Sequence, residues 1–180
     1  MLNCLTQAIW FLIPAGMANM FAGISGKLFP HFNRPLDGYR CMRGRRIFGD
    51  HKTIRGFVLG IPAGAIAFLV QMLIARNNTD LAYIVPPGFS DCVWLAFALP
   101  FGGLSGDALK SFLKRQLDID SGKSWFPFDQ TDWLIGSLLA AMICMPVSLT
   151  LISSVLSLGI VLHILVKMIG YSLHLQDELF

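Results

Sequence analysis

The chain has 180 residues, of which 54% are hydrophobic and only 14% charged, with a formal net charge of +3. Soluble domains carry about 25% charged residues, so this composition and a mean hydropathy of +0.61 predict an integral membrane protein without a separate soluble domain. The basic residues cluster beside apolar stretches, which excludes the broad basic surface of a nucleic-acid-binding protein.

Five apolar stretches follow one another along the chain, and a helix that crosses a bilayer needs about 20 residues. We therefore expect an all-α integral membrane protein with about five transmembrane helices, which form a single transmembrane domain over residues 1–180. Pro14 predicts a kink in the first span, and Pro146 interrupts the fourth. The expected spans cover residues 5–28, 57–74, 92–113, 133–151 and 154–169.

The Lys and Arg residues are shared unevenly between the loops that join these spans. The loops over residues 30–55 and 114–132 hold most of them, whereas the loop over residues 75–90 holds Arg76 alone. Loops rich in Lys and Arg stay on the cytoplasmic side of a membrane. We therefore expect two cytoplasmic loops and an N-terminus outside.

The end of the third span carries a polar stripe. Asp107, Lys110, Ser111 and Lys114 are spaced i, i+3, i+4 and i+7, so that they share one face of a helix. An ionisable group at membrane depth costs roughly 2.5–3.5 kcal/mol on insertion scales, and it persists there only beside a partner, a cavity or water. The stripe predicts a polar site for a metal ion and phosphates. The alternative is a helix end whose charges reach to the interface.

The first cytoplasmic loop ends in a cluster of cations interleaved with glycines. Arg grips phosphate oxygens through paired hydrogen bonds, and glycine lets the backbone approach a ligand closely. The cluster therefore predicts a polyphosphate site; the alternative is an anchor that touches anionic lipid headgroups. Its polar members are Arg45, Arg46, Asp50, His51, Lys52 and Arg55.

The second cytoplasmic loop brings two carboxylates to the start of the fourth span. Asp129 and Asp132 are three residues apart, so they face the same side of a helix that begins there. With Asp107 they would place three carboxylates from two helices together, and oxygen ligands beside phosphates suit Mg²⁺. The alternative for Asp129 is a helix N-cap. Asp118 and Asp120 are expected to be solvated.

Three blocks of the chain carry a resemblance to a known family. Residues 44–56, 100–115 and 122–132 resemble the signatures of the CDP-archaeol synthase family, within the wider group of membrane CTP:phosphatidate cytidylyltransferases. That group has an Asp followed by Ser-x-x-Lys-Arg and then Asp-Arg-x-Asp. The first half is matched by Asp107, Ser111, Lys114 and Arg115, and the second by Asp129 and Asp132, with Gln130 where the wider group has Arg.

The resemblance implies an enzyme of phospholipid biosynthesis in the cell membrane, with its active site on the cytoplasmic side. The implied reaction joins CTP to a lipid phosphate, gives a CDP-lipid and pyrophosphate, and requires Mg²⁺. The family's lipid is a glycerol phosphate with two ether-linked geranylgeranyl chains. No residue distinguishes this diether lipid from a diacyl phosphatidate. A small transporter and a lipid-binding protein without turnover remain as alternatives.

On this reading, each polar cluster has a role. Asp107 and Asp129 hold Mg²⁺, and Asp132 is a third ligand or supports the other two. Contacts to the CTP phosphates or to pyrophosphate come from Lys110, Lys114 and Arg115, on the same helix as Ser111. The nucleotide or the lipid phosphate is covered by Arg45, Arg46, Lys52 and Arg55, in a loop oriented by Asp50 and His51. Close approach of a substrate or a neighbouring helix is expected at Gly102, Gly103 and Gly106.

Overall fold

The computed structural model describes residues 2–120, 123, 125 and 127–172. The described part is mostly helical, as the composition predicted, and residues 122, 124 and 126 of the block 122–132 lie outside it. Its elements are α1 (Leu2–Leu28), β1 (Cys41–Met42), β2 (Arg45–Arg46), α2 (Ile54–Asn77), the 3₁₀ helix η1 (Thr79–Ile84), α3 (Leu95–Gln116), α4 (Phe128–Cys144) and α5 (Leu149–Ser172).

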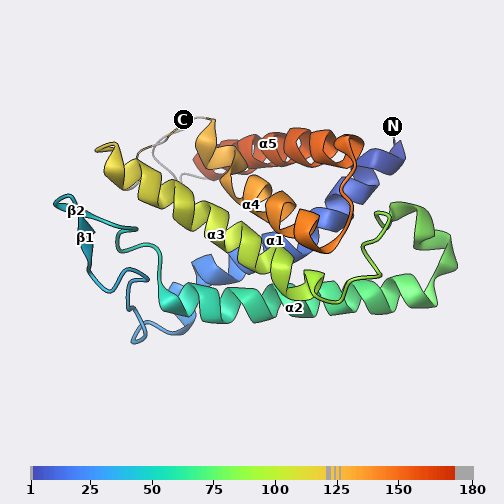
Figure 1. Ribbon diagram of the computed structural model, residues 1–180, viewed down its shortest axis with the longest axis horizontal. Helices are drawn as coiled ribbons and strands as arrows, with labels where there is room; N and C mark the ends of the chain where they lie inside the picture. Colours follow the sequence, from blue (N-terminus) through green and yellow to red (C-terminus); the bar gives the residue numbers. More distant parts are fainter. Residues whose placement is uncertain (1, 121–122, 124, 126, 173–180) are drawn as a thin grey trace.

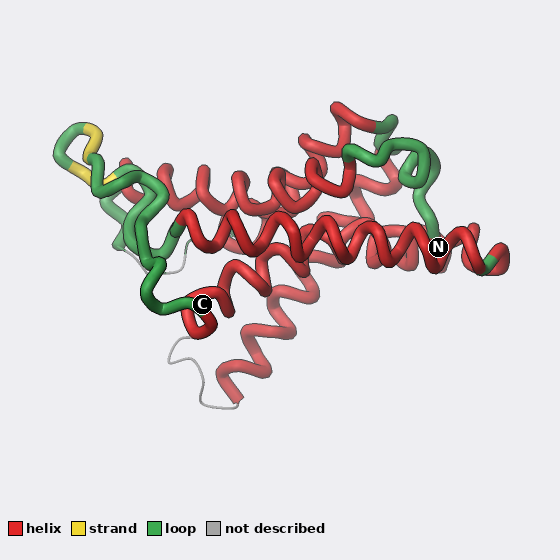
Figure 2. The backbone as a smooth tube through the Cα atoms, turned by 90° about the horizontal axis from the view of Figure 1, so that it is seen from below, coloured by secondary structure: helices red, strands yellow, loops and turns green. Residues whose placement is uncertain are grey.

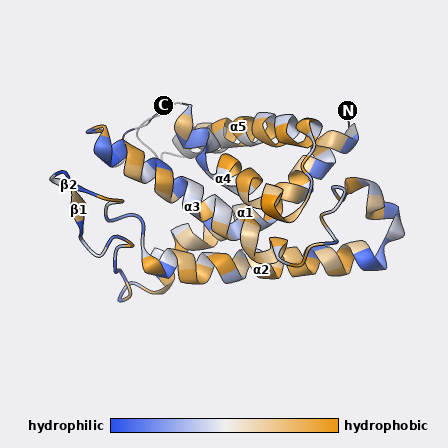
Figure 3. Ribbon diagram, in the orientation of Figure 1, coloured by the Kyte–Doolittle hydropathy of each residue, from blue (hydrophilic) through white to orange (hydrophobic). Residues whose placement is uncertain are grey.

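Two α-helices among the described residues are long and apolar enough to cross a membrane, over Asn3–Leu28 and Ile54–Asn77. A shorter apolar stretch covers Leu149–Leu162 of α5. Figure 3 shows that the helices are largely hydrophobic, whereas hydrophilic residues gather at the C-terminal end of α3 and along the loop with β1 and β2. Their length and composition would allow α1 and α2 to cross a membrane.

The boundary between α4 and α5 corrects the expected spans 133–151 and 154–169. The helix α4 ends at Cys144, because Met145 precedes Pro146 and is extended, with φ −149° and ψ 156°. A residue before proline is pushed out of the helical region by the proline ring. Helix α5 starts again at Leu149, and the Ser148 hydroxyl accepts a hydrogen bond from the Leu151 N–H at 3.2 Å.

The helix α1 continues through Pro14, from Leu2 to Leu28. One further expectation needs correction. The connection over residues 75–90 is not a plain loop, since α2 continues to Asn77 and η1 follows it.

The helices cross one another, and their polar connections lie at opposite ends (Figure 1). The loop with β1 and β2 is at one end, and the connection between α2 and α3 is at the other, as the perpendicular view also shows (Figure 2). Buried aromatic rings close the latter end: Phe89 lies with its ring centroid 6.3 Å from that of Phe11 and 5.0 Å from that of Phe68.

Glycines bring the backbones of α3 and α4 together. Gly102 packs against the carbonyl oxygen of Gly136, and Gly106 packs against that of Asp132, so closely that neither glycine has room for a Cβ atom. Small residues permit this kind of approach between helices in a membrane. Because Gly106 precedes Asp107, the contact also places the acidic residues of the two helices side by side.

Candidate active site

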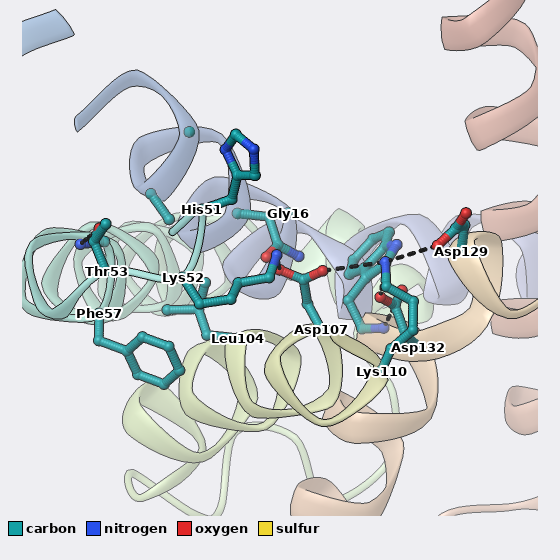
Figure 4. A pocket seen from close by; sticks show the side chains of 15 residues that line it. Gly16, His51, Lys52, Thr53, Phe57, Leu104, Asp107, Lys110, Asp129 and Asp132 are labelled. Atoms are coloured by element: carbon teal, nitrogen blue, oxygen red, sulfur yellow. Dashed lines mark hydrogen bonds and ion pairs between the residues drawn. The ribbon is translucent and has the colours of Figure 1, made fainter. Parts of the chain in front are cut away.

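A cavity of about 440 Å³ lies between α1, the start of α2, α3 and the start of α4. Figure 4 shows charged side chains from α3, from the start of α4 and from the loop before α2 pointing toward one another. Six of the predicted site residues line the cavity, namely His51, Lys52, Asp107, Lys110, Asp129 and Asp132.

Three carboxylates meet one ammonium group in this cavity. The Nζ atom of Lys110 lies 3.3 Å from Asp107 Oδ1, 3.1 Å from Asp129 Oδ1 and 2.7 Å from Asp132 Oδ2. All four side chains are mostly buried; that of Asp132 is 5% exposed. The i, i+3 spacing of Asp107 with Lys110 and of Asp129 with Asp132 therefore produces the convergence that the sequence predicted.

The loop before α2 contributes a second cation. The Nζ atom of Lys52 pairs with Asp107 Oδ2. Its backbone is fixed on both sides: the Lys52 carbonyl accepts the N–H of Leu36 at 2.7 Å, and the Thr53 hydroxyl caps α2 by accepting the N–H of Gly56 at 3.1 Å. An N-cap of this kind holds the chain where it enters a helix, which here directs Lys52 at the cavity.

The rest of that loop is organised around the buried carboxylate of Asp37. Its Oδ2 atom accepts the N–H groups of Phe48 and Gly49 at 3.0 and 3.1 Å, and its Oδ1 atom accepts that of Tyr39 at 3.0 Å. The guanidinium of Arg46 pairs with Asp37 at 2.9 Å. Although burial alone would raise the pKa of Asp37, this guanidinium and the three N–H groups lower it below its usual range.

A further cation supports the start of α4. The Nζ atom of Lys114 is buried, lies 3.3 Å from Asp129 Oδ1 and donates to the carbonyl of Lys123. The other carboxylate oxygen of Asp129 accepts the backbone N–H of Trp125 at 2.6 Å. Asp129 therefore both faces the cavity and satisfies a backbone donor just before α4.

Other predicted site residues lie outside the cavity lining. Arg45 pairs with Asp118 and donates to the carbonyl of Gln116, so Asp118 is exposed but not free. Arg46 also pairs with Asp50, at 3.0 Å. The Ser111 hydroxyl donates to the carbonyl of Asp107 within the same helix, at 3.0 Å.

Arg55 and Arg115 also lie outside the cavity lining, and so does the exposed carboxylate of Asp120. Arg55 bridges α2 to the end of α1, by donating to the Ser25 hydroxyl at 3.2 Å and to the carbonyl of Phe29 at 2.6 Å. Arg115 lies beside the loop, 3.9 Å from where a Cβ of Gly49 would be. Asp120 is exposed as expected and pairs with Lys123 at 2.8 Å.

The comparison with known proteins agrees with the three signature blocks. The family model described as CarS-like, CDP-archaeol synthase, matches residues 1–180. The chain belongs to the CDP-archaeol synthase family.

Curated members of this family cover nearly the whole chain. The CDP-archaeol synthase of Methanospirillum hungatei is 37% identical over 92% of this chain and 98% of its own length. Those of Methanococcoides burtonii and Methanocaldococcus jannaschii are 34% and 33% identical, over 93% and 96% of this chain and 99% and 96% of their own lengths.

A solved structure extends the likeness to the fold. It is described as "Structural insight into an intramembrane enzyme for archaeal membrane lipids biosynthesis", and it superposes with a TM-score of 0.71 at 27% identity, over 89% of this chain and 92% of its own. Membership of the CDP-archaeol synthase family makes the chain a CTP-dependent cytidylyltransferase that synthesises a CDP-lipid.

The sequence did not predict one wall of the cavity. This wall belongs to α1 and includes Gly16, Asn19 and Gly23, and Trp133 of α4 also lines the cavity. The signal that could have pointed to α1 is the amide of Asn19 within an apolar span, because such a residue turns toward protein or a cavity rather than toward lipid.

The chemistry of the acidic cluster fits a divalent cation such as Mg²⁺. Its three carboxylates are hard oxygen donors, and Asp132 Oδ2 is buried without a hydrogen bond of good geometry, although Lys110 is close to it. In the arrangement described, the Lys110 ammonium lies among the carboxylates, and the described residues hold no group of three His, Cys, Asp or Glu side chains close enough to ligate one ion. A bound ion would therefore require Lys110 to move aside.

Proposed function

We propose that the chain transfers the cytidylyl group of CTP to the phosphate of a lipid, with Mg²⁺, and releases pyrophosphate. The proposed lipid is 2,3-bis-O-geranylgeranylglycerol 1-phosphate or a related phosphatidate. The observation that carries this proposal is the set of three carboxylates from α3 and α4 that faces two lysines in one cavity between apolar helices.

The reaction makes one bond and breaks one. An oxygen of the lipid phosphate attacks the α-phosphorus of CTP, and the bond from that phosphorus to the oxygen bridging to the β-phosphate breaks. Pyrophosphate leaves with the bonding electron pair. A phosphate monoester is already ionised near neutral pH, so positioning and neutralisation of charge supply most of the acceleration.

The residues of the cavity either position the substrates or neutralise their charge. In the proposal, Asp107, Asp129 and Asp132 hold Mg²⁺, which when bound withdraws charge from the triphosphate. Lys52 and Lys110 then exchange their carboxylate partners for phosphate oxygens. Charge-assisted hydrogen bonds of this kind are about twice as strong as neutral ones. Because the attacking phosphate is already ionised, the transfer itself needs no strong base.

The cations outside the cavity lining act from its margin. We propose that Lys114 fixes Asp129, while Arg45, Arg46 and Arg115 approach the terminal phosphates when nucleotide is bound. Four residues support the site in this proposal. Asp50 and His51 orient the loop, Ser111 braces α3, and Arg55 ties α2 to α1.

The proposed topology has five spans within a single domain over residues 1–180, an N-terminus outside, and the cavity on the cytoplasmic side of the cell membrane. Its support is the concentration of basic residues in the loops at the cavity end of the helices. A reporter fused near residue 80 should be found outside; a cytoplasmic reporter there would overturn this topology.

The decisive experiment measures CTP-dependent release of pyrophosphate by the purified protein with Mg²⁺. Geranylgeranyl diether phosphate and diacyl phosphatidate are offered side by side, and the CDP-lipid product is identified by mass spectrometry. Release with either lipid supports the proposal, and the ratio of the two rates identifies the substrate class. Lipid binding without pyrophosphate release would instead indicate a transporter or a non-catalytic lipid-binding protein.

A further inference from the structure

The cavity has two walls of different chemistry. The wall from α3, α4 and the loop before α2 carries the charged groups, whereas the wall from α1 consists of uncharged residues. Gly16, Asn19 and Gly23 are spaced i, i+3 and i+7, so they form one stripe along α1. The reaction requires two substrates, and each wall has the chemistry to hold a different one.

The Asn19 amide lies at the depth of the acidic cluster. Gly64 packs against Pro14 of α1 and Pro100 of α3, and Gly60 packs against Ala18 and Leu104, one helical turn further along both helices. The helices α1 and α3 therefore run in the same direction. Extending this register puts Asn19 within about one turn, 5.4 Å, of Asp107 along the helix axes.

The stripe faces open space, unlike the face of α1 that meets Gly60 of α2. A Cβ atom added to Gly16 or Gly23 would have no neighbour within 4 Å, whereas the carbonyl group of Ala18 packs directly against Gly60. The side chain of Asn19 is half-buried and has no hydrogen-bond partner in the described part of the chain. This wall is thus built around an available amide.

The opposite wall carries the buried carboxylate of Asp132, whose Oδ2 atom pairs with the Lys110 ammonium at 2.7 Å. The Asn19 amide on one wall and this ion pair on the other therefore line the same cavity.

The chemistry of the two substrates assigns them to the two walls. CTP carries about four negative charges and needs the lysines and a metal ion, which only the α3–α4 side supplies. The lipid keeps its chains in the bilayer, and α1 is a helix long and apolar enough to cross it. An amide N–H can hold a phosphate oxygen without removing the charge that makes that oxygen a nucleophile.

We propose that the stripe of α1 is the subsite for the lipid phosphate, in which Asn19 donates its side-chain N–H to a phosphate oxygen. Gly16 and Gly23 leave room on either side for the glycerol end of the lipid. This inference rests on the proposed function, because it assigns one of the two substrates of that reaction to a wall.

The test compares Asn19→Ala with Met20→Ala, whose side chain is on the exposed side of α1. Turnover by the full-length protein is measured against diether phosphate at saturating CTP and against CTP at saturating lipid. Loss of a hydrogen bond to a charged group should raise KM for the lipid about tenfold or more, with less than a twofold change in KM for CTP. Met20→Ala should match the wild type in both.

A steric variant and a binding measurement keep the test independent of misfolding. Gly16→Leu, for which the structure has space at the Cβ atom, should weaken equilibrium binding of the diether phosphate while CTP binding with Mg²⁺ is retained. Retained CTP binding shows that each variant is folded. If Asn19→Ala weakens CTP binding as much as lipid binding, or weakens neither, the assignment is overturned.

The same data separate this inference from the proposed function. A wild-type protein without CTP-dependent turnover contradicts the proposed function. The subsite is then judged by equilibrium binding of the diether phosphate alone, and an unchanged dissociation constant in Asn19→Ala overturns it. An active wild type with unaltered lipid kinetics in Asn19→Ala overturns the subsite only.

Discussion

The Nζ atom of Lys110 lies 2.7 Å from the Oδ2 atom of Asp132, and this buried ion pair joins α3 to α4. The same ammonium is within 3.3 Å of Asp107 and Asp129. A single lysine therefore neutralises part of the charge of all three carboxylates. A divalent cation and the Lys110 ammonium compete for the same oxygens, so binding of the ion and movement of the lysine are coupled.

We predict that Lys110→Met has two opposite effects. Turnover should fall about 100-fold or more, because a cation that stabilises the developing charge is lost. Affinity of the nucleotide-free protein for Mn²⁺, used as a probe for Mg²⁺, should rise about tenfold, because a competing positive charge is removed. Steady-state kinetics and electron paramagnetic resonance of free Mn²⁺ measure the two effects.

The control for this prediction is Lys110→Arg, which retains the charge and should not tighten Mn²⁺ binding. Unchanged Mn²⁺ affinity in Lys110→Met would show that the lysine and the ion do not share the carboxylates.

We predict that Asp107→Asn abolishes turnover without unfolding the protein. Asp107 pairs with both Lys52 and Lys110, and it is only about three-quarters buried, so the loss of its charge leaves Lys110 with two other carboxylates. The expected loss is about 100-fold or more in kcat. Asp80→Asn in η1, at the far end of the molecule, is the matched control and should have wild-type kinetics. Wild-type rates in Asp107→Asn would refute its role in holding metal.

The acidic cluster was predictable because its members follow helical spacing. Asp107 with Lys110, and Asp129 with Asp132, are each three residues apart, and an i, i+3 pair has to share a helix face. The position of Lys110 among the carboxylates was not predictable from spacing, since it depends on how closely Gly106 lets α3 approach α4. The sequence predicted that Lys110 contacts phosphate, but it did not predict that Lys110 pairs with these three carboxylates.

Other features were not predictable from the sequence pattern. Arg55, which the sequence predicts as one cation of a phosphate-binding cluster, also donates to Ser25 and Phe29 across the α1–α2 junction. The end of α4 was placed too late, because the hydrophobic pattern continues past Pro146 while the backbone does not. The sequence pattern did not single out Asp37, although it organises the loop that carries Lys52.

We predict that protection of the loop around Asp37 depends on pH in a defined direction. Its carboxylate has a lowered pKa in the folded loop, so the unfolded loop binds a proton more readily, with a pKa near 3.9. The stabilisation is therefore complete above about pH 4–5 and is lost as the pH falls through the lower folded-state pKa. Hydrogen exchange of the Phe48 and Gly49 N–H groups, followed by mass spectrometry, measures it.

Asp37→Asn is the matched variant for this measurement. An amide presents one acceptor oxygen and an NH₂ group, so it cannot accept both the Arg46 guanidinium and the backbone N–H groups as the carboxylate does. Exchange at Phe48 and Gly49 should be faster than in the wild type at pH 7, and the acid-dependent step should disappear. Equal protection in both proteins would contradict the role of the charge.

We predict that Gly106→Ala separates α3 from α4 and disables the site. A Cβ atom at residue 106 would overlap the carbonyl oxygen of Asp132, and a backbone atom cannot rotate away as a side chain can. Overpacking of this kind costs about 1–3 kcal/mol, and thermal unfolding in detergent should show it as a lower midpoint. Turnover should fall as well, because Asp107 and Asp132 move apart. Gly23→Ala on α1 is the control for stability, since its Cβ atom would meet nothing within 4 Å, and its midpoint should not fall. Equal midpoints for Gly106→Ala and Gly23→Ala would show that the close approach of α3 and α4 does not limit stability.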